Sequence, residues 1–199
     1  MDESRFHNEA ALAVAQQVGN RRLEGNTRCN IGLQHHVHGK FTEALEQLEA
    51  ALAVARDLGH VRLECVVLCN LGMVHDSQAR FEEARVHFEA ALIIAREIGD
   101  LRSEGQFLGY LGLTHAHRAN FDEARCSLDS GEALLRALSD RLSIGILLCS
   151  RAETEQLAGH PDAARAALAE ADAIAAEVGS GPDSELGLAL ARVRNLGTH

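Results

Sequence analysis

The chain has 199 residues, of which 46% are hydrophobic and 24% charged, and its net charge at pH 7 is −10. The length suits one domain or one continuous array with a sizeable core, and the composition is ordinary for a globular protein. So acidic a chain repels a phosphate backbone, and only Lys40 is a lysine among the 19 basic residues, so we expect no nucleic-acid partner.

The first element in the chain is a helix that the sequence predicts over residues 4–18. The segment "MDESRFHNEA" lacks the basic start and apolar core of a signal peptide. No apolar stretch approaches the roughly 18 residues that a membrane span needs, so we expect no membrane partner. The five cysteines are odd in number and irregularly spaced, which favours reduced thiols in a cytoplasmic protein.

Residues 41–80 and 81–120 are two copies of one segment. Seventeen of forty positions are identical without a gap. The same phase runs in both directions, because the chain repeats glycines at Gly19, Gly59, Gly99 and Gly179, at Gly32, Gly72 and Gly112, and alanines at Ala44, Ala84, Ala124 and Ala164. A fixed period of 20–50 residues is typical of a solenoid.

Each period contains two helices. In 81–98 an apolar residue recurs every three or four positions, which gives one apolar face, at Ala84, Phe88, Ala91, Leu92 and Ala95. Gly99 then supplies the left-handed residue that ends a helix, and Asp100 can cap the next one. The phase predicts helices over 4–18, 21–38, 41–58, 61–78, 81–98, 101–118, 121–138, 141–158, 161–178 and 183–196.

The repeated segment resembles the tetratricopeptide repeat, whose pattern is W-x2-L-G-x2-Y followed by A-x3-F. Here Leu68-x2-Leu71-Gly72-x2-His75 precedes Ala84-x3-Phe88. The period is forty residues, as in the long variety of this repeat. The resemblance implies an all-α fold, a right-handed α-solenoid of antiparallel helix pairs in one array. Its parts would be an unpaired helix in 1–20, pairs in 21–60, 61–100, 101–140 and 141–180, and a capping helix in 181–199.

Three histidines in "LQHHVHGKF" raise the question of a metal site. His35, however, lies one period before His75 and two before His115, in the aromatic position of the repeat. We therefore expect each ring to pack between the two helices of its own pair, with one nitrogen bonded to the backbone. Cys65 and Cys69 could form half a metal site, but core thiols explain them as well. The sequence predicts no metal and no cofactor.

No motif of a catalytic nucleophile, a phosphate-binding loop or a dinucleotide site occurs, so we expect no enzyme. In the resembling family the first helix of each pair lines the concave side. Carried onto this chain, the expected peptide-binding residues are Asn26, Cys29, Asn30, Leu33 and His36; Val66, Cys69, Asn70, Met73 and Asp76; Gln106, Tyr110, Leu113 and His117; and, in the fourth pair, Ile146, Cys149, Ser150, Glu153 and Gln156.

Two functions fit this surface. The first is a non-catalytic module that binds a protein or peptide partner in the concave groove. Because the groove residues are apolar and neutral to acidic, we expect a partner with apolar anchors that is not itself acidic. The second is a ligand-sensing regulatory segment of a larger bacterial signalling or transcription-regulating protein.

The predicted helix over 4–18 aligns with the second helix of each pair, and its own first helix is absent from the sequence. It carries apolar residues over much of its circumference, at Phe6, Ala10, Leu12, Ala13 and Val14. A terminal repeat needs a polar outer face. We therefore expect this face to be covered, either by preceding repeats or by a second copy of the chain in a homodimer through helix 1–18.

Overall fold

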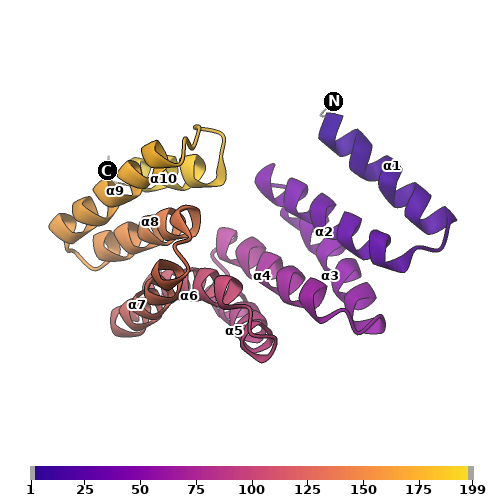
Figure 1. Ribbon diagram of the computed structural model, residues 1–199, viewed down its shortest axis with the longest axis horizontal. Coiled ribbons are helices and arrows are strands. Elements are labelled where there is room, and N and C mark those ends of the chain that lie inside the picture. The colour runs from indigo at the N-terminus through magenta and orange to yellow at the C-terminus, as the bar shows by residue number, and fades with distance from the viewer. Residues whose placement is uncertain (1–2, 197–199) are drawn as a thin grey trace. The chain divides into compact units, whose positions relative to one another are not determined.

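The computed structural model describes residues 3–196, and side chains from residue 8 onward. Within this range the chain forms ten α-helices and no strand, which confirms the predicted all-α fold of repeated helix pairs (Figure 1). Two parts of the sequence-based predictions lie outside the described side chains. One is Phe6, which belongs to the apolar face of the first helix that we expect to be covered. The other is residues 197–199, the end of the predicted capping segment.

The helices follow the forty-residue phase. Their bounds are α1 (Glu3–Gln17), α2 (Arg21–Val37), α3 (Phe41–Asp57), α4 (Val61–Ser77), α5 (Phe81–Glu97), α6 (Leu101–His117), α7 (Phe121–Ala137), α8 (Arg141–Leu157), α9 (Pro161–Glu177) and α10 (Glu185–Leu196). We call the even-numbered helices the first helices and the odd-numbered ones the second helices. Only α10 departs by more than one residue from the prediction. It begins late because the Ser184 hydroxyl caps it, accepting a hydrogen bond from the amide of Gly187.

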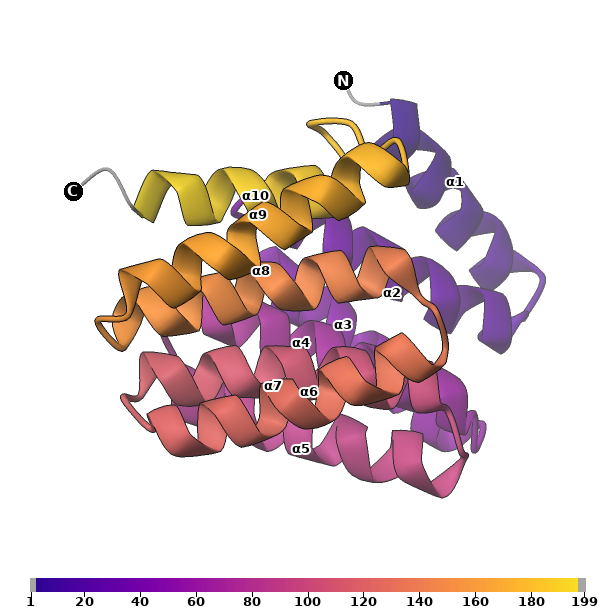
Figure 2. The ribbon, with the colours of Figure 1, turned by 60° about the vertical axis from the view of Figure 1, so that its left-hand side comes forward.

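The chain divides into two compact units, residues 1–95 and residues 96–199, with the division in the last turn of α5. In the first unit, α2 packs with α3, and α4 with α5. In the second unit, α6 packs with α7, α8 with α9, and α10 lies against α8 and α9 (Figure 2).

The two helices of a pair approach closely at one glycine. A Cβ placed on Gly32 would lie 2.7 Å from Leu48, on Gly72 2.6 Å from Phe88, and on Gly112 2.7 Å from Leu128. Any side chain larger than hydrogen would push the second helix away. The recurrence of glycine at this position, noted in the sequence, therefore reflects backbone-to-side-chain packing between the paired helices.

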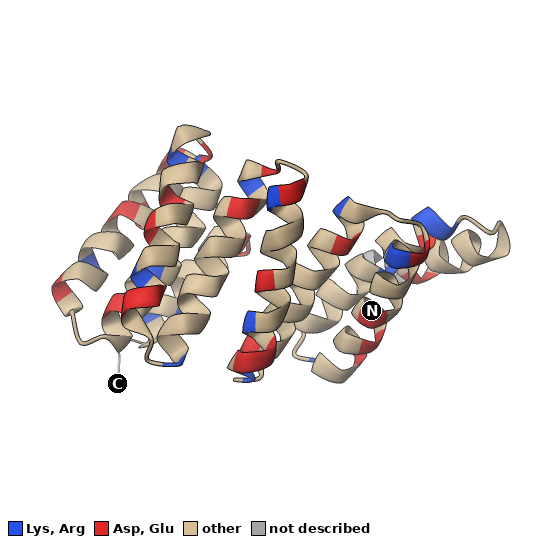
Figure 3. Ribbon diagram, turned by 90° about the horizontal axis from the view of Figure 1, so that it is seen from below, with Lys and Arg blue, Asp and Glu red and all other residues tan. Residues whose placement is uncertain are grey.

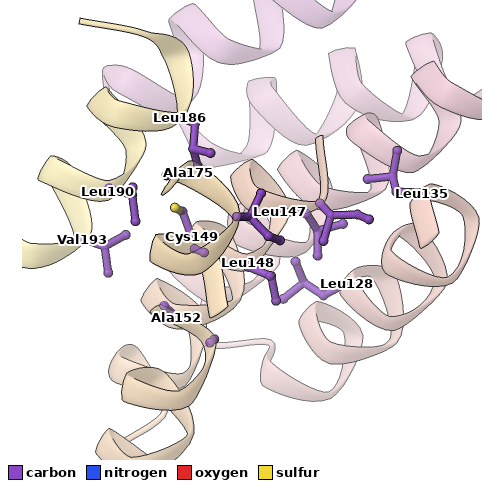
Figure 4. Close-up of a cluster of buried hydrophobic side chains, with 14 residues drawn as sticks. Leu128, Leu135, Leu147, Leu148, Cys149, Ala152, Ala175, Leu186, Leu190 and Val193 are labelled. Atoms are coloured by element: carbon purple, nitrogen blue, oxygen red, sulfur yellow. The ribbon is translucent and has the colours of Figure 1, made fainter. Parts of the chain in front are cut away.

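The second unit has a core in which α10 takes part. Leu186, Leu190 and Val193 of α10 are buried beside Cys149 of α8 (Figure 4). On the other side of α8, Leu147 and Leu148 pack with Leu128 and Leu135 of α7, and further buried residues of α8 and α9 complete the cluster. The C-terminal helix is thus fixed to the array by apolar burial.

A left-handed residue recurs every twenty positions. Six of these residues are glycines, and the others are Ala79, Ala119 and Ser139, with φ between 55° and 59°. The sequence predicted such a residue at Gly99, and Gly19, Gly59 and Gly179 repeat in the same phase. It did not predict the alternate set, which includes both alanines. An L-residue with a Cβ costs about 1–2 kcal/mol in this conformation.

Replacement of Ala119 by glycine should raise the free energy of unfolding by about 0.5–1 kcal/mol. The relief of backbone strain is partly offset because glycine makes the unfolded chain more flexible. Gly159→Ala is the matched control and should lower the free energy of unfolding. Gly159 has φ +79° and a Cβ at that position would meet no neighbour within 4 Å, so the strain in the variant is purely backbone. Urea denaturation measures both variants. Equal stability of Ala119→Gly and the parent would contradict the assignment of strain.

The histidine of the repeat motif packs inside the pair, as predicted for His75. His75 is buried on α4, and its ring stacks on that of His87 on α5, with centroids 5.1 Å apart and planes at 3°. We expected one ring nitrogen of this histidine to bond the backbone, but the buried Nδ1 of His75 has no hydrogen-bond partner. Burial lowers the pKa of both rings. The proximity of His87 and Arg80 lowers the pKa of His75 further, whereas Glu83 raises it.

Protein stability should therefore fall as the pH drops below about 6.5. The unfolded chain, with ordinary histidine pKa values near 6.5, binds protons there that the folded state resists. His87→Leu should reduce this loss of melting temperature between pH 7.5 and 5.5, and His75→Ala should cost about 1–3 kcal/mol at pH 7.5.

The exposed His38 lies outside the stack, so His38→Asn is the control substitution and should not reproduce the effect of His87→Leu. His36, whose pKa burial also lowers, contributes separately in the same direction. An unchanged pH profile in His87→Leu would contradict the role of the stack. Loss of stoichiometric zinc binding in His75→Ala at an unchanged melting temperature would contradict the packing role.

Candidate functional site

Two polar contacts join the first helices of the first unit. Asn70 on α4 donates from Nδ2 to the sulfur of Cys29 on α2 at 3.3 Å, and His36 Nε2 lies 2.8 Å from the hydroxyl of Ser77. Asp76 is close enough to oppose the lowering of the His36 pKa that burial causes. The structure thus brings together four of the side chains that the sequence assigned to one surface.

The exposure of the predicted residues on α2 and α4 divides them into two groups. Cys29 and Cys69 are buried, and burial raises the pKa of the Cys29 thiol. These two thiols lie beneath the solvent-facing side chains, so they cannot contact a ligand in this conformation. The remaining side chains reach solvent: Asn26, Asn30, Leu33 and Val66 are exposed, and His36, Asn70, Met73 and Asp76 are half-buried.

We call this solvent-facing set of eight residues the α2/α4 surface. It combines amides with aliphatic side chains, and Leu33 and Val66 are 38% and 46% exposed. The only carboxylate in the set is Asp76, and the set contains no lysine or arginine. An amide can both donate and accept hydrogen bonds, which suits a peptide backbone. The aliphatic neighbours suit an apolar side chain.

The corresponding surface of the second unit is occupied by its own polar pairs. Gln106 on α6 donates to the hydroxyl of Ser143 on α8 at 2.8 Å, and Tyr110 donates to Glu185 of α10 at 3.2 Å. His117 Nε2 lies 3.0 Å from Glu153 Oε1. Leu113 is buried and cannot contact a ligand in this conformation.

Glu153 links three helices of the second unit. Its other carboxylate oxygen lies 3.1 Å from Arg192 of α10, and its side chain is 8% exposed. Two other residues that the sequence assigned to the fourth pair, Cys149 and Ser150, are also buried, and burial raises the pKa of the Cys149 thiol to about 12. These residues hold α10 against α8 and leave few polar groups for a ligand.

The residues on α10 that complete this network were not predicted from the sequence. Glu185 and Arg192 lie far along the chain from Tyr110 and Glu153, and nothing in the repeat phase assigns them a partner. The pairing of Arg125 with Glu155 was missed as well, although Glu155 interrupts the series of histidines. A charged residue in a packing position signals a partner on the neighbouring helix.

Charges of both signs alternate along the described helices (Figure 3). Within the described residues, no three side chains of His, Cys, Asp or Glu gather as metal ligands would. None of the described helices has the length and hydrophobicity of a bilayer-crossing segment. The α2/α4 surface, with Asp76 as its one charged residue, is a partly apolar candidate for binding.

Comparison with known proteins supports the fold. A sequence model of the tetratricopeptide repeat matches residues 66–98, which cover most of α4 and α5. Among solved structures, that of BtubC (BKLC) from P. vanneervenii is similar, with a TM-score of 0.71 and 18% identity over 87% of this chain and 72% of that chain. At this identity the likeness concerns the fold alone. No curated protein sequence matches.

The match over 66–98 covers most of one helix pair, and similar pairs recur at forty-residue intervals on both sides of it. The structural likeness extends this arrangement beyond the matched segment. The chain therefore contains a tetratricopeptide repeat at residues 66–98, within a series of similar helix pairs.

Proposed function

We propose that this protein is a non-catalytic interaction module that binds a peptide segment on the α2/α4 surface. Tetratricopeptide repeats generally mediate contacts between proteins. The observation that carries the proposal is the combination of exposed Asn30 and half-buried Asn70 with exposed Leu33 and Val66, without a basic residue in the surface.

The preferred partner has aliphatic anchors and a backbone accessible to the two amides. Asn70 uses one donor on Cys29, which fixes the orientation of its side chain. Its carbonyl oxygen can then accept from a peptide N–H without an entropic cost of ordering. A strongly acidic peptide is disfavoured because Asp76 is the only charged group of the surface and is itself negative.

The second unit is a weaker candidate for the same role. The polar groups of Gln106, Tyr110 and His117 have partners inside the unit. A ligand there would first have to replace those hydrogen bonds, with little net gain. We therefore place binding on the first unit.

A library of displayed peptides selected against the intact protein tests this proposal. Peptides selected for the α2/α4 surface, after those that still bind Val66→Asp are discarded, should be rich in aliphatic residues and poor in acidic ones. Asn30→Ala and Val66→Asp should each weaken a selected peptide by about tenfold or more in calorimetric titration, which corresponds to about 1.4 kcal/mol for the loss of a hydrogen bond or an apolar contact.

Glu46→Gln on α3 and Arg85→Gln on α5 serve as controls, because both residues lie on second helices away from this surface. Their affinities should equal that of the parent. Circular dichroism should show all four variants folded. Loss of binding in the two controls with retention in Asn30→Ala and Val66→Asp would overturn the proposal.

A further inference from the structure

The corner between α7 and α8 is closed by a partly buried ion pair. Arg125 on α7 donates from Nε and Nη2 to the two carboxylate oxygens of Glu155 on α8, at 2.8 and 2.9 Å. His160 Nδ1 lies 2.9 Å from the same carboxylate. Glu155 is 8% exposed, and the Arg125 guanidinium holds its pKa at about 2. This bidentate contact is among the strongest hydrogen-bonding arrangements that a carboxylate makes with a side chain.

The same corner recurs forty residues later without its carboxylate. Arg165 on α9 stands in the position of Arg125, but Asn195 on α10 stands in that of Glu155. Arg165 pairs with Asp162 one turn earlier on the exposed face of α9. Arg125 has an equivalent neighbour in Asp122, at 4.0 Å, and nevertheless binds Glu155. The neighbouring aspartate therefore does not prevent an arginine in this position from binding a second carboxylate.

The apolar part of this corner is also less filled. Leu128 is fully buried, whereas Leu168, its counterpart on α9, is only partly buried. A cleft of about 540 Å³ opens here, within the range of 300–1,000 Å³ typical of ligand sites. Its lining comes from three helices of the second unit: Gln156, Pro161, Ala164, Arg165, Leu168, Val193 and Arg194.

The charged side chains that line the cleft are basic, and aspartates outside the lining pair with them. Its lining contains two arginines and no carboxylate, whereas the protein carries a net charge of −10. Arg194 pairs with Asp172 at 2.5 Å, outside the lining. Apolar side chains of Ala164, Leu168 and Val193 adjoin the two guanidinium groups. This combination complements a negative group attached to an aliphatic one.

We propose that the cleft between α9 and α10 binds the carboxylate side chain of an acidic residue in a partner's peptide segment, next to an aliphatic residue of that segment. Arg165 binds this carboxylate as Arg125 binds Glu155, and Leu168 and Pro161 contact the aliphatic side chain. The site is distinct from the α2/α4 surface and does not depend on its function.

Two short peptides test the chemistry. Acetyl-Leu-Glu-Leu-amide should shift the amide resonances around Arg165, Leu168 and Val193 in the spectrum of the full chain. Its glutamine counterpart should bind at least about fivefold more weakly, as expected for the loss of a charge-assisted hydrogen bond at a partly exposed site. Equal binding of the two peptides, or shifts scattered over the chain, would overturn the proposal.

Two arginine variants separate this cleft from general charge. Arg165→Gln should weaken the glutamate peptide by about fivefold or more. Arg141→Gln is the matched control, because Arg141 pairs with Glu177 at the opposite end of α8 and α9. It removes the same charge and should leave the affinity unchanged. Equal effects of both variants would mean that only the net charge matters, and the proposal would fail.

Asn195→Glu introduces, on α10, the carboxylate that the corner between α9 and α10 lacks. By analogy with Glu155, the new side chain should pair with Arg165, raise the melting temperature and abolish binding of the glutamate peptide. Unchanged peptide binding in Asn195→Glu would contradict the proposal. Tighter binding of free 4-methylpentanoate than of the peptide would also contradict the proposal, because it assigns the cleft to a small fatty acid. Peptide binding seen only after removal of residues 197–199 would contradict it too, because it assigns the cleft to the chain's own C-terminus.

Discussion

The close contact between a glycine of each first helix and a large side chain of its second helix is the constraint on which the repeats depend. Gly72 against Phe88 and Gly112 against Leu128 set how near the paired helices lie. Once that distance is fixed, only particular positions can face inward, and His75 comes to stack on His87. In the fourth pair Ala152 takes the glycine position. At the histidine position of α8, Glu155 instead forms an ion pair with Arg125 of the preceding helix, α7.

The fold was predictable because it is local and repeated. Each helix is bounded by a left-handed residue, and the apolar positions recur with the helical period, so one segment predicts all the others. The late start of α10 was not predictable from the phase, because Ser184 caps the helix after a proline-containing turn. Likewise, the use of alanine at positions 79 and 119 became clear only from the backbone angles, since alanine carries no turn signal in the sequence.

The candidate site was predictable only in part. The resemblance to the repeat family assigned Asn30, Asn70, Leu33 and Val66 to the concave surface, and their side chains are exposed or half-buried. It could not tell that Cys29, Cys69 and Leu113 are buried, because a first helix has neighbours on more than one side. Nor could it tell that α10 supplies partners for Tyr110 and Glu153. These contacts join residues from different repeats, and no single period contains them.

Departures from the repeat are the more informative positions in such a protein. A residue that obeys the phase is explained by packing, which every repeat shares. Where the phase is broken, the local chemistry must be balanced in another way. Glu155 departs from the repeat phase and forms an ion pair with Arg125. Asn195, at the equivalent position of the next repeat, is polar but uncharged. Arg165 therefore lines a cleft whose lining contains no carboxylate. Because the same corner is filled in one repeat and open in the next, the chain itself supplies the reference for the chemistry that the open corner can accept.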